Sequence, residues 1–340
     1  MSSSATGTVI LTGANGGLGT AIVKQLASDS KFSTYYNIYT VRDATKSQEI
    51  TSEVPHEFVS LDLTDLTNVR QVAEVINARI NAGEIPPIRA LILNAGFQDF
   101  GKQTWTSQGL DTTFAANYLG HWLLTLLLLG SMSKVDGRVI YVGSEAHDPT
   151  DPKNTSRGFD NPKYKTIISN ADSFHAIAKG TWSPATEDAG FRGGYRRYGA
   201  SKCFQVMMQH ELQARLDADP ELSRLCVVGV DPGYMATGLQ RLAPWVIRVL
   251  LFQVVFPLIS YLLPKKAPLR PTSLPASEVL EAAFAAGEGP GSLKDKYFFE
   301  QKPKETGEES RDMAKRALVW KETVKLAGLK ENETSIAQWQ

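Results

Sequence analysis

The sequence predicts an α/β fold in which one doubly wound parallel sheet, with helices on both faces, belongs to a single domain that takes in all 340 residues. Short β-branched runs alternate with longer stretches of helical spacing, which is the pattern of repeated strand–helix–strand units. The strand runs also lack strict polar alternation. That is expected where helices cover both faces of a parallel sheet, because neither face then meets water.

Six runs are predicted to be the strands of this sheet. The stretches between them, such as LTNVRQVAEVINARI at 66–80, place apolar residues on one helix face. In chain order the six runs are TVIL at 8–11, NIYTV at 37–41, EFVSL at 57–61, LIL at 91–93, RVIYV at 138–142 and LCVVGV at 225–230.

Two stretches depart from this rhythm of strands and helices. Residues 146–193 are polar, contain Pro and Gly, and are far longer than an ordinary connection, so they are predicted to be a surface insertion. Residues 308–340 are predicted to form a helix at about 308–327, capped by Gly328, and a polar tail. The residues that recur at helical spacing and should pack on the body are Met313, Ala317, Trp320 and Val324.

A third exception lies in the segment 238–275. Its residues 242–263 (LAPWVIRVLLFQVVFPLISYLL) are nearly long enough to cross a bilayer. The residues that interrupt the apolar run are Pro244, Arg248, Gln253 and Pro257. Because a charge and two prolines are unfavourable in a membrane span, the segment is predicted to be a lid over a binding site. The alternatives are an interfacial membrane anchor and a membrane span.

Charge and cysteine content restrict the partner and the location. Lys and Arg together number 36, as do Asp and Glu, so the formal net charge is zero, and no basic tract indicates nucleic acid. We therefore expect a small-molecule partner. The two cysteines, Cys203 and Cys226, have no metal-type spacing, so no metal site is predicted. Together with a start that lacks a secretory pattern, this favours a reducing, cytoplasmic location.

A glycine-rich turn, TGANGGLG at 12–19, follows the first strand run, and a helix begins near Leu18. Glycines let the backbone approach a pyrophosphate closely, and the helix N-terminus supplies amide donors and a favourable dipole. The position of this turn after the first strand predicts a dinucleotide site.

The end of the second strand run predicts which dinucleotide binds. Arg42 and Asp43 follow Val41, where a dinucleotide fold meets the adenosine ribose. A guanidinium favours a ribose 2′-phosphate, whereas a carboxylate favours a free 2′-hydroxyl. Arg42 therefore predicts NADP(H). The alternative is that Arg42 is a solvated loop charge and that Asp43 contacts the ribose.

Polar residues and glycines also follow the third and fourth strand runs. Asp62 and Leu63 come after the third, and Asn94, Ala95 and Gly96 come after the fourth. Open α/β sheets bind ligands at these carboxyl ends, so all five are predicted to line the cofactor, with Asp62 accepting a hydrogen bond from the adenine amine.

Tyr198 and Lys202 lie four residues apart, a spacing that places both on one face of a helix. An unperturbed phenol ionises near pH ~10, so it is a poor proton shuttle at neutral pH. A cation beside it favours the ionised form and lowers its pKa. The pair therefore predicts a tuned acid/base group.

Six motifs in a fixed order resemble the short-chain dehydrogenase/reductase family, over residues 8 to about 237. They are TGANGGLG at 12–19, NAG at 94–96, Asn117 in FAANYLG, Ser144 in YVGSEAH, YGASK at 198–202 and DPGYMAT at 231–237. Within the family, TGANGGLG, the VRD strand end and NYLGHWLLT look most like the branch of retinol-dehydrogenase-type and WW-domain-oxidoreductase-type enzymes. The resemblance implies a Rossmann-type domain and an oxidoreductase that interconverts a carbonyl and an alcohol.

The resemblance also implies the role of each site residue. Ser144 would hydrogen-bond the substrate carbonyl oxygen, Tyr198 would donate the proton, and Lys202 would hold the cofactor ribose and tune Tyr198. Asn117 would support a proton-relay water. The implied cofactor residues are Gly13, Asn15, Gly16, Gly17, Leu18 and Gly19 around the phosphates, Asn94 and Gly96 along the cofactor, and Pro232, Gly233 and Thr237 beside the nicotinamide.

The chain departs from the family pattern between Ser144 and Tyr198, where the insertion lengthens the connection and should remodel the mouth of the site. The candidate substrate contacts in the insertion, each of which is expected to be structural, are His147, His175, Trp182 and Arg192. His121 lies in an apolar helix and is predicted to be a hydrogen-bonded packing residue.

Three hypotheses follow from the residues. The first is a reductase of a hydrophobic ketone or aldehyde, because an apolar segment follows Thr237, and an NADP(H) preference favours reduction. The second is a catalytically silent or non-redox NADP(H)-binding scaffold, against which the filled positions of the catalytic residues argue. The third is the same enzyme in peripheral contact with a membrane through 242–263. A homodimer through the helices carrying NYLGHWLLT and YGASK is a further possibility.

Overall fold

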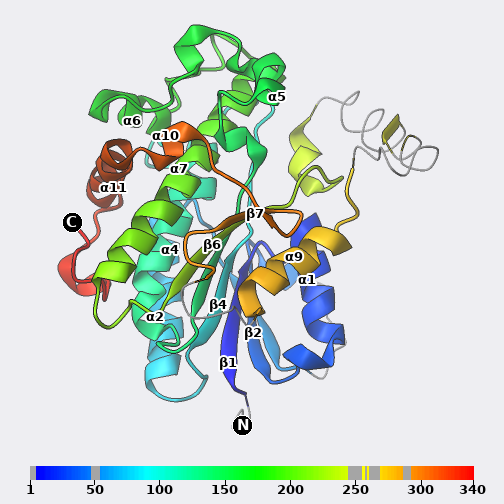
Figure 1. Ribbon diagram of the computed structural model, residues 1–340, viewed down its shortest axis with the longest axis vertical. Helices are drawn as coiled ribbons and strands as arrows, with labels where there is room; N and C mark the ends of the chain where they lie inside the picture. Colours follow the sequence, from blue (N-terminus) through cyan, green and yellow to red (C-terminus); the bar gives the residue numbers. More distant parts are fainter. Residues whose placement is uncertain (1–4, 47–53, 244–254, 257–258, 260–268, 286–291) are drawn as a thin grey trace.

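The computed structural model describes residues 5–46, 54–243, 255–256, 259, 269–285 and 292–340 (Figure 1). Within these residues one sheet has eight strands in the order β3-β2-β1-β4-β5-β6-β7-β8. All neighbours up to β7 pair in parallel, and β8 pairs antiparallel with β7. The strands are β1 Gly7–Thr12, β2 Tyr35–Val41, β3 His56–Ser60, β4 Ile88–Leu93, β5 Arg138–Val142, β6 Cys226–Asp231, β7 Tyr297–Phe299 and β8 Lys302–Pro303.

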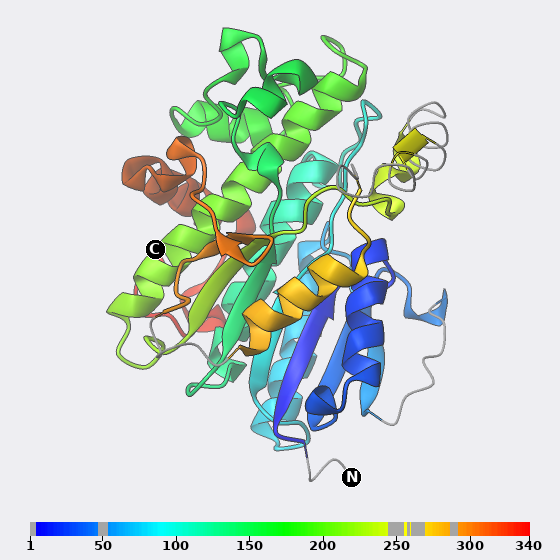
Figure 2. The same cartoon turned by 45° about the vertical axis from the view of Figure 1, so that its right-hand side comes forward.

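Helices cover both faces of this sheet (Figures 1 and 2). On one face lie α1 (Gly17–Ser28) and α9 (Ser273–Phe284), which pack against each other. On the other face lie α2 (Leu66–Asn81), α4 (Gly120–Leu128) and α7 (Phe191–Ala218). The prediction of a doubly wound parallel sheet is thereby confirmed. The short antiparallel β8 extends its edge.

Each face of the sheet has its own hydrophobic core. Val9 is buried in the core beneath α1 and α9, whereas its neighbour Ile10 is buried in the core beneath α2, α4 and α7. This follows from the period of two along a strand, which sends successive side chains to opposite faces. Every position of β1 is buried, and its apolar residues Val9, Ile10 and Leu11 serve two cores at once, which explains the absence of polar alternation.

The insertion lies beyond the carboxyl ends of the strands (Figure 1). It holds the short helix α5 (Pro152–Asn154) and α6 (Ala171–Ala178), and Asn170 caps α6 by accepting a hydrogen bond from the Ser173 amide. Helix α7 already begins at Phe191, so the last residues of the predicted insertion 146–193 belong to that helix.

A buried ion pair holds the first turns of α7 to the loop after β4. Both carboxylate oxygens of Asp99 accept hydrogen bonds from the Arg197 guanidinium, at 2.7 and 2.8 Å. The Asp99 and Arg197 side chains are 1% and 3% exposed, so water does not solvate either charge and each charge depends on the other. This bidentate contact fixes the start of the helix that carries Tyr198.

The C-terminal helix differs from its prediction in two ways. It is broken into α10 (Glu308–Arg311) and α11 (Met313–Ala327) because Asp312 adopts an extended conformation and caps α11 by accepting from the Lys315 amide. Gly328 ends α11 with φ 59°, as expected for a left-handed cap. The predicted inward positions Met313 and Ala317 are exposed. Trp320 is buried as predicted and Val324 is half-buried. The inward face also holds Val319, Glu322, Thr323 and Ala327.

The described residues include one helix that is apolar enough to be compared with a membrane span. One helical run there, 112–131, is long and apolar enough to cross a membrane, but 89% of its most apolar window is buried inside the protein. The predicted lid or anchor at 242–263 lies almost wholly outside the described residues, which include only 242–243, 255–256 and 259 of it.

Candidate active site

The carboxyl ends of β1, β4, β5 and β6 bring the sequence motifs together at one edge of the sheet (Figure 2). The strand order changes direction between β1 and β4, which is where open α/β sheets form their ligand crevice. Residues far apart in the sequence therefore meet at this edge, where a dinucleotide would contact them.

The glycine turn after β1 has the shape that a pyrophosphate needs. Gly13 has φ 67°, and a Cβ there would stand 2.8 Å from the Cα of Ala95. A Cβ on Gly19 would stand 2.2 Å from the Gly13 carbonyl oxygen, so only glycine allows this close approach of helix and turn. The Asn94 side chain braces the turn by donating to the carbonyls of Thr12 and Gly13, at 2.8 and 3.1 Å.

The N-terminus of α1 offers free amide donors to an anion. Gly16 stands at the cap position and supplies no side-chain hydrogen bond, so the first-turn amides from Gly17 onward are available. Asn15 is exposed beside them, whereas Leu18 is buried in the core and serves packing. The turn and helix end thus fit the phosphates of a dinucleotide.

The loop after β6 folds back over this turn. Thr237 lies against Gly17, where an added Cβ would come within 2.8 Å of the threonine Cβ. Gly233 has φ 70° and its amide donates to Asp231 at 3.0 Å, while the Pro232 carbonyl accepts from Arg270 at 3.0 Å. The predicted nicotinamide-side residues are therefore held in place, with Thr237 close to the start of α1.

The end of β2 separates the roles of its two charged residues. Asp43 is engaged in its own turn: it accepts from the Thr45 amide and hydroxyl at 3.1 and 2.6 Å and pairs with Lys46 at 2.7 Å. Arg42 is exposed, and its positive charge acts on Arg241 of the loop after β6 to lower the pKa of that guanidinium, in addition to the larger effect of burial. Two cations therefore lie near each other beside the dinucleotide crevice.

The remaining predicted cofactor residues differ in their burial and in the hydrogen bonds that they already make. Oδ1 of Asp62 accepts from the Thr64 amide and hydroxyl at 2.9 and 2.7 Å, and Gly96 is exposed. Leu63 is buried, and its carbonyl would stand 2.2 Å from a Cβ on Gly120. Leu63 therefore serves the packing of the loop on α4, whereas Gly96 is exposed after the carboxyl end of β4, where an added Cβ would lie 3.8 Å or more from its neighbours.

Tyr198, Ser144 and Lys202 converge where β5 meets α7. Burial raises the pKa of Tyr198 above its usual range, while a hydrogen bond with the Ser144 side chain lowers it. The Lys202 ammonium nitrogen lies 5.6 Å from the centre of the Tyr198 ring and donates to the Val142 carbonyl at 3.0 Å. A hydroxyl pair beside an amine is an arrangement that can polarise a carbonyl and deliver a proton to it.

Asn117 lies in a π-helical turn, Ala115–Leu119, directly before α4. Its side chain exchanges hydrogen bonds with the backbone of Phe97, accepting at 2.7 Å and donating at 2.9 Å, and it also donates to the Ser201 hydroxyl at 2.9 Å. Its main-chain carbonyl accepts from His121 Nδ1 at 3.0 Å. Asn117 therefore ties the loop after β4 to the helix of Tyr198 and Lys202.

Sequence reasoning missed two residues beside Lys202, which are Gln205, whose Oε1 accepts from the Lys202 ammonium at 2.7 Å, and Asp231. It also missed Glu145, which follows Ser144. Asp231 is buried at the end of β6, where burial raises its pKa, and its charge in turn raises the pKa of Lys202. The available signals were a carboxyl closing a buried strand run and a polar residue three positions after a catalytic lysine.

Glu145 joins the insertion to the loop after β6, directly beside Ser144. It pairs with Arg157 of the insertion at 2.5 Å, and it accepts a hydrogen bond from Tyr234. The Arg157 guanidinium also lies 4.7 Å from the centre of the Tyr234 ring. The insertion thus reaches the mouth of the site through this contact.

The four insertion residues considered as substrate contacts all have structural partners. His147 bonds the Ser144 carbonyl and accepts from the Gly307 amide, at 2.7 and 2.9 Å. The partners of the other three are Glu322 for His175, Tyr164 for Trp182 and Asp160 for Arg192. His121 is fully buried and hydrogen-bonded, as predicted for a packing histidine.

Comparisons with known proteins agree with this geometry. The family model of short chain dehydrogenases matches residues 7–155. A short-chain dehydrogenase of Talaromyces variabilis, iccH, is 38% identical over 98% of this chain and 99% of its own length. The chloroplastic protochlorophyllide reductase of Daucus carota is 30% identical over 95% of this chain and 78% of its own.

Among solved structures, an uncharacterized protein from Mycobacterium paratuberculosis superposes with a TM-score of 0.64 at 22% identity. The match covers 96% of this chain and 95% of that protein. At this identity the likeness establishes the fold.

Proposed function

The chain belongs to the short-chain dehydrogenase family and is an oxidoreductase, and we propose that it uses NADPH to reduce a hydrophobic ketone or aldehyde to an alcohol, with Tyr198 as the general acid. The observation that carries the proposal is the convergence of the Tyr198 and Ser144 hydroxyls beside the Lys202 ammonium.

In the proposed reaction, the substrate carbonyl oxygen accepts hydrogen bonds from Ser144 and Tyr198. When bound, NADPH supplies the hydride. As negative charge develops on the oxygen, the Tyr198 hydroxyl transfers its proton to it, and Ser144 stabilises the charge with a donor already in place. The Lys202 ammonium favours the resulting phenolate by its positive charge. Lys202 would also hold the cofactor ribose.

The preference for NADPH rests on the end of β2. Arg42 is exposed at the position that meets the adenosine ribose, whereas the Asp43 carboxylate is already occupied by Thr45 and Lys46. A guanidinium that has no tight carboxylate partner among the described residues suits a 2′-phosphate. Arg241 adds a second positive charge near the same place.

A hydrophobic substrate is supported by the surroundings of Tyr198. A small apolar cluster contains Tyr198 with Phe159 and Tyr195, whose rings lie 6.2 Å apart. Phe191 and Leu239 pack against it and are only partly buried. An apolar, largely aromatic wall beside the acid favours a bulky apolar carbonyl compound.

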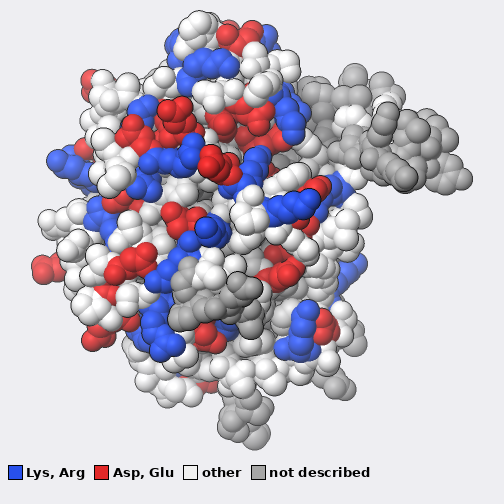
Figure 3. Space-filling view, viewed as in Figure 1, with Lys and Arg blue, Asp and Glu red and all other residues white. Residues whose placement is uncertain are grey.

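We propose that the enzyme acts in the cytoplasm, where the two buried thiols Cys203 and Cys226 would stay reduced. The mixed surface of Figure 3, with basic and acidic side chains interspersed over the visible face, also suits a small-molecule partner rather than a polyanion.

Spectrophotometric oxidation of NADPH tests the function. We expect turnover with bulky apolar ketones or aldehydes and little with small polar aldehydes of equal reactivity. Tight NADPH binding without turnover across the whole panel would favour the non-redox scaffold instead. If the protein bound neither NADPH nor NADH, both the reductase and the scaffold hypothesis would be excluded.

A further inference from the structure

The buried face of α7 carries three glutamines one helical turn apart, Gln205, Gln209 and Gln213, and each is at most 2% exposed. Gln209 donates to the Lys296 carbonyl at 3.2 Å, and Gln213 accepts from the Val227 amide at 2.7 Å, so these two fasten the helix to neighbouring backbone.

Gln205 has different partners. Its Oε1 accepts from the Lys202 ammonium at 2.7 Å, and its Nε2 lies 3.4 Å from His121 Nδ1. The amide oxygen must face Lys202, because an ammonium group only donates hydrogen bonds.

We propose that Gln205 is the positioning residue that aims the Lys202 ammonium at the cofactor ribose and keeps it protonated during turnover. The proposal rests on the reaction described above, because it assigns Gln205 a role through Lys202. Gln205 itself touches neither substrate nor cofactor in this account.

The donor count on Lys202 supports the aiming role. An ammonium has three N–H donors, and two are taken by the Val142 carbonyl at 3.0 Å and Gln205 Oε1 at 2.7 Å. The lysine side chain is 3% exposed, so its head has little freedom to turn elsewhere. With two donors fixed, the third is left for the ribose and for the Tyr198 side of the crevice.

The same two acceptors support the charge of Lys202. Burial is the largest effect on this group and lowers the pKa of Lys202 to about 7, close to the working range of an enzyme. A carbonyl dipole at 2.7 Å stabilises the protonated form only, so its removal should lower the pKa further.

Three other titratable groups lie around Lys202, and their effects on its charge differ from that of Gln205. Tyr198 shares its helix, His121 faces it from α4, and Asp231 faces it from the end of β6. Burial lowers the pKa of His121 to about 3, so that ring stays neutral. Asp231 lies 3.9 Å from Lys304, and Tyr297 of β7 feels its charge.

His121, which lies next to Gln205, is itself held by two polar contacts. Its Nδ1 donates to the Asn117 carbonyl at 3.0 Å, and its Nε2 lies 3.0 Å from the Thr12 hydroxyl. The same hydroxyl accepts from the amides of Asn94 and Ala95 at 2.9 and 3.0 Å. Hydrogen bonds therefore connect Asn117 through His121 and Thr12 to the cofactor turn, and the Gln205 side chain lies between this group and Lys202.

The test compares Gln205→Leu, Gln205→Glu and the matched control Gln209→Leu, which removes the next buried glutamine of the same helix. The first readout is the pKa of Lys202 in the full-length protein, followed by NMR of ¹³C-labelled lysine and assigned with Lys202→Arg. The second is the pH profile of kcat for NADPH-dependent reduction, whose alkaline limb reports loss of the Lys202 proton.

For Gln205→Leu we expect the pKa of Lys202 and the alkaline limb to move down by about one pH unit, with kcat near neutral pH falling roughly tenfold. Gln205→Glu should move both upward, because it places a carboxylate against the ammonium. Gln209→Leu should leave both where they are in the unmodified protein.

The proposal is overturned if Gln205→Leu leaves the Lys202 titration unchanged while the protein stays folded, or if Gln209→Leu shifts it equally. The NMR titration requires no turnover. If the unmodified protein does not oxidise NADPH, the proposed function fails, and the titration still decides whether Gln205 holds Lys202 protonated.

Discussion

Trp320 of α11 packs edge-to-face on Trp122 of α4, with ring centres 5.3 Å apart and an interplanar angle of 68°. A hydrogen bond of 2.7 Å between Tyr118 and Thr323 lies on the same interface. The C-terminal helix thus covers α4 and α7, the helices through which the sequence predicted a possible homodimer, so we expect a dimer through them to require displacement of α11.

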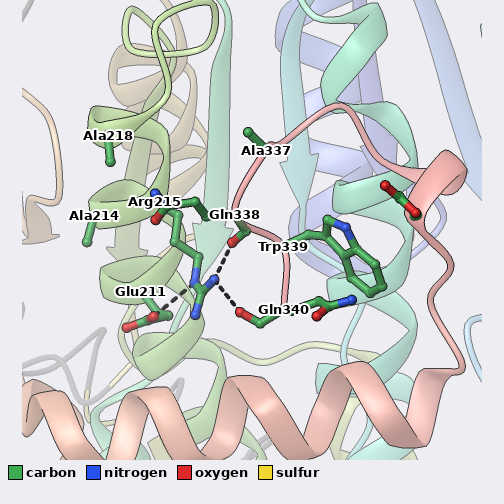
Figure 4. Close-up of a pocket in the computed structure, with 9 residues that line it drawn as sticks. Glu211, Ala214, Arg215, Ala218, Ala337, Gln338, Trp339 and Gln340 are labelled. Atoms are coloured by element: carbon green, nitrogen blue, oxygen red, sulfur yellow. Dashed lines mark hydrogen bonds and ion pairs between the residues drawn. The ribbon is translucent and has the colours of Figure 1, made fainter.

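The tail that follows α11 completes this cover. Arg215 at the last turn of α7 pairs with Glu211 at 2.9 Å and donates to the carbonyls of Gln338 and Gln340, lining the hollow drawn in Figure 4. Along α7 this hollow lies about 25 Å from Tyr198, given the rise of about 1.5 Å per residue. It therefore belongs to the docking of the tail and not to the site of reduction.

Replacing Trp320 should weaken the fold. Trp320→Ala removes a fully buried ring and should lower the free energy of unfolding by about 3–5 kcal/mol, as expected for large cavities. Met313→Ala on the same helix is the control, because Met313 is 76% exposed and its loss should cost less than about 0.5 kcal/mol. Urea unfolding measures both, and equal losses would contradict the docking described here.

Ser144→Ala should reduce kcat roughly 100- to 1000-fold with little change in NADPH affinity, because it removes a donor to the developing oxyanion. Ser144 also accepts from the Ala146 amide at 3.2 Å, so thermal unfolding must show that the turn after β5 survives. An unchanged kcat in a folded variant would exclude Ser144 from the proposed chemistry.

Arg42→Gln should weaken NADPH binding by roughly 10- to 100-fold and leave NADH binding nearly unaltered, as loss of a charge-assisted phosphate contact predicts. Asp43→Asn provides the comparison, because its carboxylate already serves Thr45 and Lys46. Fluorescence titration with both nucleotides separates the two residues. If Asp43→Asn weakened NADH binding more than Arg42→Gln did, Asp43 would be the residue that contacts the adenosine ribose.

Acid should destabilise the fold through His121. Its pKa falls from an ordinary value near ~6.5 in the unfolded chain to about 3 in the fold. Between these values the unfolded chain binds a proton that the folded protein does not, so the free energy of unfolding decreases as the pH falls, by about 1.4 kcal/mol per pH unit.

The matched variant isolates this effect. His121→Asn should flatten the decrease in unfolding free energy between pH 6 and pH 4 relative to the unmodified protein. His175→Asn, at a side chain that is 44% exposed, should not. Parallel curves for His121→Asn and the unmodified protein would mean that His121 is not held neutral by the fold.

The sheet could be predicted because its signals are local. Each of the six predicted strand runs overlaps an observed strand, since these strands hold five to seven residues, enough to show in the sequence that both faces are buried. β7 holds only three residues and β8 two, too few for any periodicity to be seen. Of the positions predicted to face inward on α11, Trp320 is correct, but Met313 and Ala317 are wrong, because the inward face is set by Trp122 and its neighbours, which the helix itself does not reveal.

For the site, spacing on one helix predicted the pairing of Tyr198 with Lys202, while the resemblance supplied Ser144 and Asn117. The groups behind Lys202 were missed because their meaning depends on burial. Gln205 follows Lys202 by three positions on the same helix, but only the packing of α7 against β6 buries it and brings Asp231 near the same ammonium.

The most direct test of the account is NADPH oxidation by Tyr198→Phe beside the unmodified enzyme, with NADPH affinity measured on both by fluorescence. The account predicts that the variant binds NADPH as tightly and reduces the carbonyl substrate at least about 100-fold more slowly, because the general acid is gone. A variant that binds NADPH and turns over at the unmodified rate would contradict the assignment of Tyr198 as the proton donor.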